Sequence, residues 1–223
     1  MIPHLNQNTI SIPLGKKVIQ GDLTVPAEVN GLVIFAHGSG SSRFSPRNKY
    51  VAEILNDAGF AALLIDLLTL EEESVDNRTA EHRFNIALLA DRLIGATDWA
   101  REQQRLSTLR VGYFGASTGA AAALVAGARR LSLIDAIVSR GGRPDLAADE
   151  LSSVAAPTLL IVGEFDRDVI ALNRQAAKAM KARTELQIVP GATHLFEEPG
   201  ALAHVASLAR TWFEENLIHT RAA

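Results

Sequence analysis

The chain has 223 residues, with 22 Lys plus Arg against 25 Asp plus Glu, a formal charge of -3 and no cysteine. This balance gives no basic field for nucleic acid, and the lack of cysteine excludes disulfides, thiolate metal sites and a cysteine nucleophile. We expect a single domain over residues 1–223, because this length can bury one substantial core and no polar low-complexity linker interrupts it.

Residues 1–17 lack the positively charged start and apolar run of a secretion signal. No apolar stretch elsewhere reaches about 18 residues, the length needed to span a membrane as a helix. The sequence therefore predicts a soluble cytoplasmic protein with neither a membrane nor a nucleic-acid partner.

The first third of the chain begins with apolar strands. Residues 9–14 and 17–25 predict an antiparallel hairpin, since they alternate loosely in hydropathy on either side of Gly15. Residues 31–36 (GLVIFA) are continuously apolar, which is typical of a strand buried on both faces. A loop, residues 37–43 (HGSGSSR), follows this strand.

A helix is expected after this loop. Ser45 is a suitable N-cap and Pro46 suits the first helical position. The helical pattern runs to about Asp57 and is stopped by Gly59. Residues 60–66 (FAALLID) then predict another buried strand.

The rest of the chain continues the alternation of strands and helices. Residues 67–77 are expected to form a loop or lid, and residues 78–104 are helical in pattern. The glutamates at 71–73 predict a solvated face, and a mouth that attracts cations is the alternative. Further strands are expected at 108–114, 133–139, 157–162 and 184–189, with helices after the first of these and at 169–183 and 200–217. This pattern predicts an α/β fold with a mostly parallel central sheet and helices on both faces.

The residues around Ser117 predict a sharp turn from strand to helix. An apolar run ending at Phe114 leads into Gly115-Ala116-Ser117-Thr118-Gly119, and an Ala-rich helical segment follows. The small residues two before and two after Ser117 let the chain reverse within about five residues and leave the serine hydroxyl exposed. Gly-x-Ser-x-Gly is a weak pattern alone, so its meaning depends on partners elsewhere in the chain.

Two such partners, Asp166 and His194, each follow a predicted strand, and ligands bind at the carboxyl ends of strands in parallel sheets. A serine hydroxyl needs an imidazole to take its proton and a carboxylate to orient that imidazole. Ser117, Asp166 and His194 therefore predict a catalytic triad in the chain order serine, acid, histidine. Asp168 is the alternative acid, and we expect it instead to cap the following helix.

An oxyanion that develops at the substrate carbonyl requires about two backbone N–H donors. Thr118, the residue after the nucleophile, is expected to supply one; the loop after the first buried strand supplies the other, with Ser39 favoured and Gly40 next. Residues 38–43 (GSGSSR) of the same loop partly match a dinucleotide-binding fingerprint, in which Asp66 would bind the ribose. Arg43 replaces its third glycine, which makes cofactor binding the weaker reading.

Together these motifs resemble the α/β-hydrolase superfamily and, within it, the small dienelactone-hydrolase-like esterases. The resemblance covers nearly all of the chain and rests on HGSGSSRFSPRN, GASTG, the GEFD turn with Asp166 and GATHLF with His194. It implies the α/β-hydrolase fold and neither a metal nor an organic cofactor. Dienelactone hydrolases proper use a cysteine nucleophile, whereas this chain has Ser117, which favours a serine carboxylesterase. Only residues 140–157 separate the two strands between which caps are commonly inserted, so little or no cap domain is expected.

The other histidines are interpreted as structural or solvent-exposed. His37, at the end of a buried strand, is expected to hydrogen-bond locally and hold the oxyanion loop. His4, His82, His204 and His219 show no spacing typical of metal ligands, so no metal site is expected.

Four arginines follow predicted strands and so lie near the expected active edge: Arg43, Arg47, Arg140 and Arg143. We expect them to pair with acidic neighbours, and the alternative hypothesis is that one or two bind a substrate carboxylate. The candidates for substrate binding are Gly40, Arg43 and Arg140.

The sequence thus predicts a hydrolase that cleaves small, short-acyl carboxylic esters through an acyl-enzyme on Ser117. Its expected partner is a small-molecule ester. Two alternatives stay open: a lactonase or acyltransferase/perhydrolase that uses the same triad, and a non-catalytic binding module that retains the fold.

Overall fold

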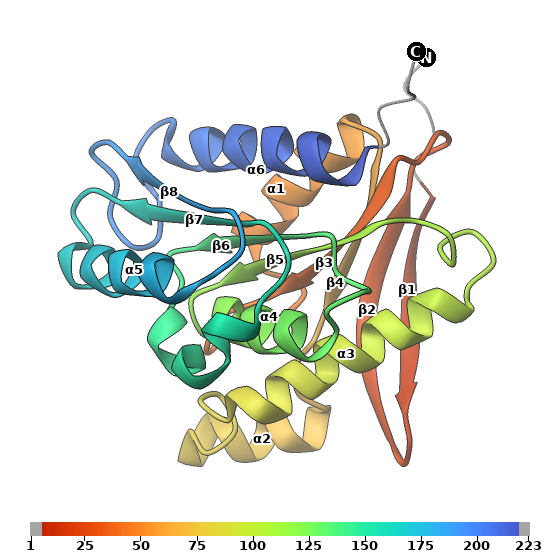
Figure 1. The fold of residues 1–223 in the computed structure, drawn as a ribbon. Coiled ribbons are helices and arrows are strands. Elements are labelled where there is room, and N and C mark those ends of the chain that lie inside the picture. Colours follow the sequence, from red (N-terminus) through yellow and green to blue (C-terminus); the bar gives the residue numbers. More distant parts are fainter. Residues whose placement is uncertain (1–5, 219–223) are drawn as a thin grey trace.

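The computed structural model describes residues 6–218, which contain one eight-stranded sheet with helices on both faces (Figure 1). The strand order is β1-β2-β4-β3-β5-β6-β7-β8. β1 (Asn6–Leu14) pairs antiparallel with β2 (Lys17–Val25), and β2 pairs antiparallel with β4. The other neighbouring strands are parallel. The expected α/β fold with a mostly parallel sheet is confirmed.

The parallel part of the sheet consists of short apolar strands. They are β3 (Gly31–Ala36), β4 (Phe60–Ile65), β5 (Val111–Ala116), β6 (Ala136–Arg140), β7 (Thr158–Gly163) and β8 (Thr184–Val189). Each lies within three residues of its expected position. Every residue of β3 to β7 is buried, as expected for strands covered on both faces.

The helices form two layers. α1 (Pro46–Asp57) and α6 (Ala201–Leu217) cover one face of the sheet, while α3 (Ile86–Glu102) and α4 (Thr118–Arg129) lie on the other (Figure 1). Successive residues of β3 point into different cores: Val33 packs with the core under α1 and α6, and Ile34 with the core under α3 and α4. The strand ends that carry the site are therefore fixed from both sides.

Helix α1 begins as expected from its capping residues. The Ser45 side chain accepts a hydrogen bond from the backbone N–H of Asn48 at 3.3 Å, and Pro46 is the first helical residue. Gly59 follows the helix with a φ of 83°, which an L side chain rarely adopts. The predicted N-cap and the predicted stop are both confirmed.

Residues 67–104 differ from the sequence-based expectation. The chain forms a helix, α2 (Leu70–Thr79), where a loop or lid was expected, and α3 begins at Ile86 rather than at residue 78. Thr69 starts α2 with a capping box to Glu72, and Ala80 ends it in the left-handed region with a φ of 58°. The hydropathy pattern does not predict α2 because the helix has no apolar stripe: none of its residues belongs to a hydrophobic core.

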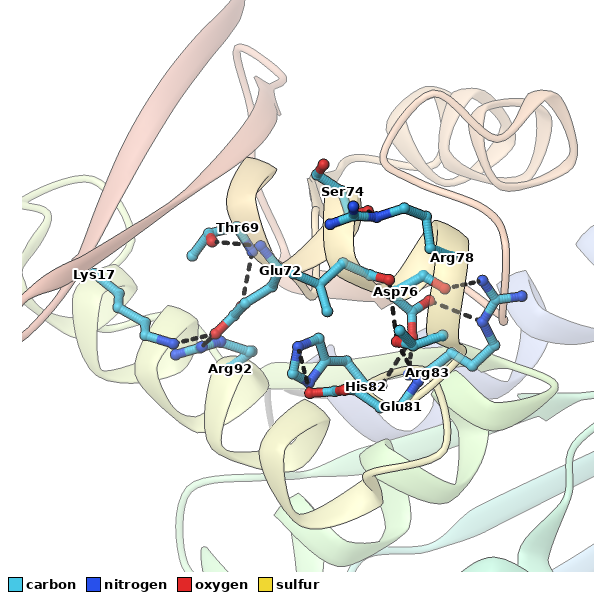
Figure 2. Close-up of polar contacts among 12 residues, drawn as sticks. Lys17, Thr69, Glu72, Ser74, Asp76, Arg78, Glu81, His82, Arg83 and Arg92 are labelled. Carbon is cyan, nitrogen blue, oxygen red and sulfur yellow. Dashed lines mark hydrogen bonds and ion pairs between the residues drawn. The ribbon is translucent and has the colours of Figure 1, made fainter.

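Two carboxylates, one helical turn apart, attach α2 to the rest of the protein (Figure 2). Glu72 binds the guanidinium of Arg92 at 2.8 Å and the ammonium of Lys17. Asp76 accepts hydrogen bonds from the backbone N–H groups of His82 and Arg83, and from Arg83 Nε at 2.8 Å. The expected solvated face is therefore wrong for Glu72, which is 7% exposed.

Helix α5 (Arg167–Ala179) and the 3-10 helix η1 (Pro144–Ser153) complete the described chain. The segment between β6 and β7 contains only η1, so no cap domain is inserted there, as expected. Across residues 6–218, no helix is long and apolar enough to cross a membrane.

Candidate active site

Ser117 lies at the tight turn between β5 and α4. Its φ of 51° and ψ of -118° are strained for a residue with a side chain. A Cβ at Gly115 would lie 2.4 Å from Ala120 Cα, and one at Gly119 would lie 2.4 Å from Ala36 O. The two glycines are therefore required for the strand and helix to approach this closely, as the sequence pattern predicts.

Asp166 and His194 are in direct contact. His194 Nδ1 lies 2.5 Å from Asp166 Oδ2, between the loops that follow β8 and β7. Asp166 occupies the N-cap position of α5, but its side chain makes no capping hydrogen bond. The expected capping role of Asp168 is wrong, because Asp168 lies within the first turn of α5 and is exposed.

His194 and Ser117 line the same pocket, which has a volume of about 240 Å³ and also includes Ser39, Arg47 and Arg140. Gly141 lies close to the imidazole of His194. A Cβ at Gly141 would lie 3.4 Å from His194 Cε1, and the φ of Gly141 is 53°. Sequence reasoning missed Gly141, although a glycine pair directly after a strand is a signal for close backbone approach. The structure therefore brings Ser117, His194 and Asp166 to one edge of the sheet.

The loop after β3 packs against the turn at Ser117. A Cβ at Gly38 would lie 3.1 Å from Ser117 Cβ, and the Ser39 and Thr118 hydroxyl oxygens are 3.1 Å apart. Thr118 is the first residue of α4, where backbone N–H groups have no partner within the helix. The two residues expected to form the oxyanion hole are therefore neighbours.

His37 holds this loop, as expected. Its Nδ1 donates to Gly38 O at 2.9 Å, and its Nε2 accepts from the backbone N–H of Leu67 at 3.1 Å. Burial lowers the pKa of His37, and the hydrogen bond to Gly38 opposes this only in part. The neutral ring can donate and accept at the same time, and it ties the loop to the end of β4.

Three of the four loop arginines are paired with carboxylates. Arg43 binds Asp66, Arg143 binds Asp145 at 2.7 Å, and Arg47 binds Glu197 at 3.2 Å. The side chain of Asp66 also accepts the backbone N–H of Arg43 at 2.8 Å, so this carboxylate is already engaged by the protein. Pairing with acidic neighbours is thus the observed state of these three guanidinium groups.

Arg140 differs from the other arginines. It is 8% exposed, its Nη1 is buried without a hydrogen-bond partner, and no carboxylate of residues 6–218 forms an ion pair with it. Burial, followed by the nearby charge of Arg47, lowers the pKa of Arg140 to about 10. A buried cation therefore lines the pocket that contains Ser117 and His194.

The remaining histidines lie away from these groups. His204 is exposed on α6, as expected. His82, which lies in the range 78–104 expected to be helical, is half-buried in the segment between α2 and α3. His4 and His219 lie outside the described residues.

Comparison with known proteins identifies the family. The model of the dienelactone hydrolase family matches residues 19–216. The chain belongs to the dienelactone hydrolase family. This family member is similar to the crystal structure of a dienelactone hydrolase from Anabaena variabilis, with a TM-score of 0.94, 55% identity and coverage of 96% of this chain and 99% of that chain. It accordingly has the α/β-hydrolase fold.

More distant and longer proteins complete the comparison. Est1E from Butyrivibrio proteoclasticus shares the fold at 17% identity, with a TM-score of 0.78 and coverage of 93% of this chain and 98% of that one. Two Mycobacterium tuberculosis proteins (strains CDC 1551 and H37Rv), each named putative phosphoribosyl transferase, are 55% identical over 215 residues. This family member spans about half the length of these curated relatives, 48% of each.

Proposed function

We propose that this dienelactone hydrolase family member is a serine hydrolase that cleaves small carboxylic esters through an acyl-enzyme on Ser117. The observation that carries the proposal is the 2.5 Å contact between Asp166 Oδ2 and His194 Nδ1, made where His194 and Ser117 line one pocket. Because the carboxylate of Asp166 engages Nδ1, Nε2 is the ring nitrogen left to accept the proton of Ser117.

The reaction then follows from the roles of these groups. His194 removes the proton from Ser117, whose oxygen attacks the ester carbonyl, and the imidazolium next gives its proton to the departing alcohol. Water repeats the sequence on the acyl-enzyme, so that the carboxylic acid leaves and Ser117 is regenerated. Asp166 keeps the imidazole oriented and stabilises its charged form.

The backbone N–H groups of Ser39 and Thr118 are proposed to bind the oxyanion. The 3.1 Å contact between their hydroxyl oxygens supports this assignment, because it sets the two residues side by side next to Ser117. The start of α4 adds the positive end of a helix dipole at Thr118.

Among the candidates for substrate binding, Arg140 has the strongest support. Burying an unpaired guanidinium costs free energy, and an anionic group on the substrate would offset this cost. Arg43 is already engaged by Asp66, and Gly40 offers only its backbone. We therefore assign to Arg140 the recognition of a carboxylate on the ester substrate.

The phosphoribosyl transferase name belongs to proteins of about twice this length. The strained serine turn and the histidine–carboxylate contact favour acyl transfer over that chemistry. We therefore do not extend the transferase name to this chain, and an assay of phosphoribosyl transfer should give no product.

Labelling with an active-serine phosphonate tests the proposal. The wild type should be labelled and should hydrolyse p-nitrophenyl acetate, while Ser117→Ala should lose both, its kcat/KM falling at least about 10³-fold. An unlabelled wild type, or equal labelling of Ser117→Ala, contradicts it. Adding an alcohol or peroxide during turnover then separates hydrolysis from acyl transfer, because only a transferase diverts most of the acyl product from water.

A further inference from the structure

A second cavity borders the oxyanion loop, and neither His194 nor Arg140 lines it. It has a volume of about 60 Å³. Its lining includes Ser39, Thr118, Leu67, Leu68, Leu89 and Glu73. The pocket that contains Ser117 also includes Ser39, so the oxyanion loop borders both spaces.

The chemistry of ester cleavage assigns a part of the substrate to each space, and this step rests on the proposed function. His194 must protonate the departing alcohol, so the alcohol portion faces the pocket that His194 lines. The carbonyl oxygen is then bound between Ser39 and Thr118. The remaining substituent of the carbonyl carbon, the acyl group, is directed to the other side, where the second cavity borders these same two residues.

We infer that the cavity beneath α2 is the acyl-binding subsite and that its size restricts the enzyme to short acyl chains. Leu67, Leu68 and Leu89 give it an apolar patch, which suits a short hydrocarbon chain. The rest of its lining is mostly polar and includes Asp66 and Arg83. Its volume of about 60 Å³ is a quarter of the 240 Å³ of the pocket that contains Ser117, so it suits a short acyl group better than a hexanoyl chain.

Helix α2 forms one wall of this subsite. Glu73, Asp76 and Asn77 of α2 contribute to the lining. Because α2 adds nothing to a hydrophobic core, the contacts of Asp76 with Arg83 and of Glu72 with Lys17 and Arg92 hold it in place (Figure 2). A longer acyl chain should gain room if this helix is displaced or if a wall residue becomes smaller.

Truncating one wall residue tests the inference, with a matched control on the same helix. Leu89 and Leu93 are both buried leucines of α3 in the same hydrophobic core, but only Leu89 lines the cavity. The substrates are p-nitrophenyl acetate, butyrate and hexanoate, which share one alcohol and therefore report on the acyl side alone. Leu89→Ala should raise the ratio of kcat/KM for hexanoate to that for acetate about tenfold or more. Leu93→Ala should leave this ratio unchanged.

Leu68→Ala provides a second test, since Leu68 is only half-buried and its truncation costs less stability. It should shift the ratio in the same direction, and Leu89→Phe should shift it the opposite way. Ratios in Leu89→Ala and Leu68→Ala that equal the wild-type ratio would overturn the acyl subsite while leaving the hydrolase intact. A wild type that hydrolyses none of the three esters and resists the phosphonate would instead overturn the proposed function, and the subsite with it.

Discussion

His194 Nδ1 lies 2.5 Å from Asp166 Oδ2, although the two residues are 28 positions apart in the chain. The contact joins the loops after β7 and β8, which are neighbouring parallel strands. It also leaves α5 without a side-chain cap, because the carboxylate at the N-cap position turns to the imidazole. Losing such a cap costs a helix about 1 kcal/mol, so the position of Asp166 is better explained by its partner than by helix stability.

The role of this contact is testable by replacing the carboxylate with an amide. We expect Asp166→Asn to lower kcat for p-nitrophenyl acetate by roughly 10³- to 10⁴-fold, because the amide cannot stabilise the imidazolium. Asp168→Asn is the control: this residue is exposed on the first turn of α5, and its kcat should stay near that of the wild type. A larger loss of kcat in Asp168→Asn than in Asp166→Asn would contradict the choice of Asp166 as the acid.

The buried guanidinium in the active pocket predicts a preference for anionic substrates. Arg140→Gln should raise KM about tenfold or more for an ester with a carboxylate on its alcohol portion, since a charged hydrogen bond is lost. KM for the neutral isostere should change little. Arg143→Gln is the matched control, because that side chain is bound by Asp145. If Arg140→Gln changes KM equally for the anionic and the neutral ester, Arg140 does not recognise the carboxylate.

His37 predicts a dependence of stability on pH. Burial holds its pKa below the ordinary 6.5 in the folded chain, so between these values the unfolded chain binds the extra proton. The stability from neutral His37 is therefore present above pH 6.5 and declines as the pH falls toward the folded pKa. Urea unfolding at pH 7 and pH 5 should show a larger loss for the wild type than for His37→Gln, which has no such proton to bind. Parallel losses in both proteins would show that this ring does not titrate on unfolding.

Helix α2 should detach when one of its two carboxylates is neutralised. Glu72→Gln leaves the buried Arg92 without its anion, and breaking such a pair costs about 3 kcal/mol. Hydrogen exchange in residues 70–79 should accelerate, while Glu71→Gln, an exposed neighbour on the same turn, should exchange as the wild type does. If Glu71→Gln accelerates exchange equally, the buried pair is not what fastens the helix.

Acid should have the same effect on α2 as this substitution. Burial raises the pKa of Glu72, but hydrogen bonds from Lys17 and Thr69 and the charge of Arg92 outweigh it, and the resulting pKa is lower than usual. The pKa of Asp76 is also lowered, because hydrogen bonds from Arg83 and His82 outweigh its burial. The stabilisation is therefore present above the ordinary carboxyl pKa and is lost as the pH falls through the folded values.

The outline of the fold could be read from the chain because its signals are local. Largely apolar runs predict β3 to β7, and Ser45 and Pro46 predict the start of α1 correctly. Helix α2 could not be predicted in this way, since its buried face consists of Glu72 and Asp76 rather than apolar residues. The partners of Glu72, which are Lys17 and Arg92, come from distant segments, so no pattern within the helix indicates them.

The sequence by itself determined the strand ends that carry reactive side chains and the glycine-flanked turn at Ser117, because both follow from neighbouring residues. Only the tertiary structure decided which charged groups are partnered. Asp166 and Asp168 follow the same strand, and the sequence only favours Asp166 as the acid; in the structure Asp166 contacts His194 and Asp168 is exposed. Arg43 follows β3 and Arg140 is the last residue of β6, but of these two only Arg140 is buried without an anion. Such differences depend on distance and burial across the sheet edge, and these are set by the packing of segments far apart in the chain.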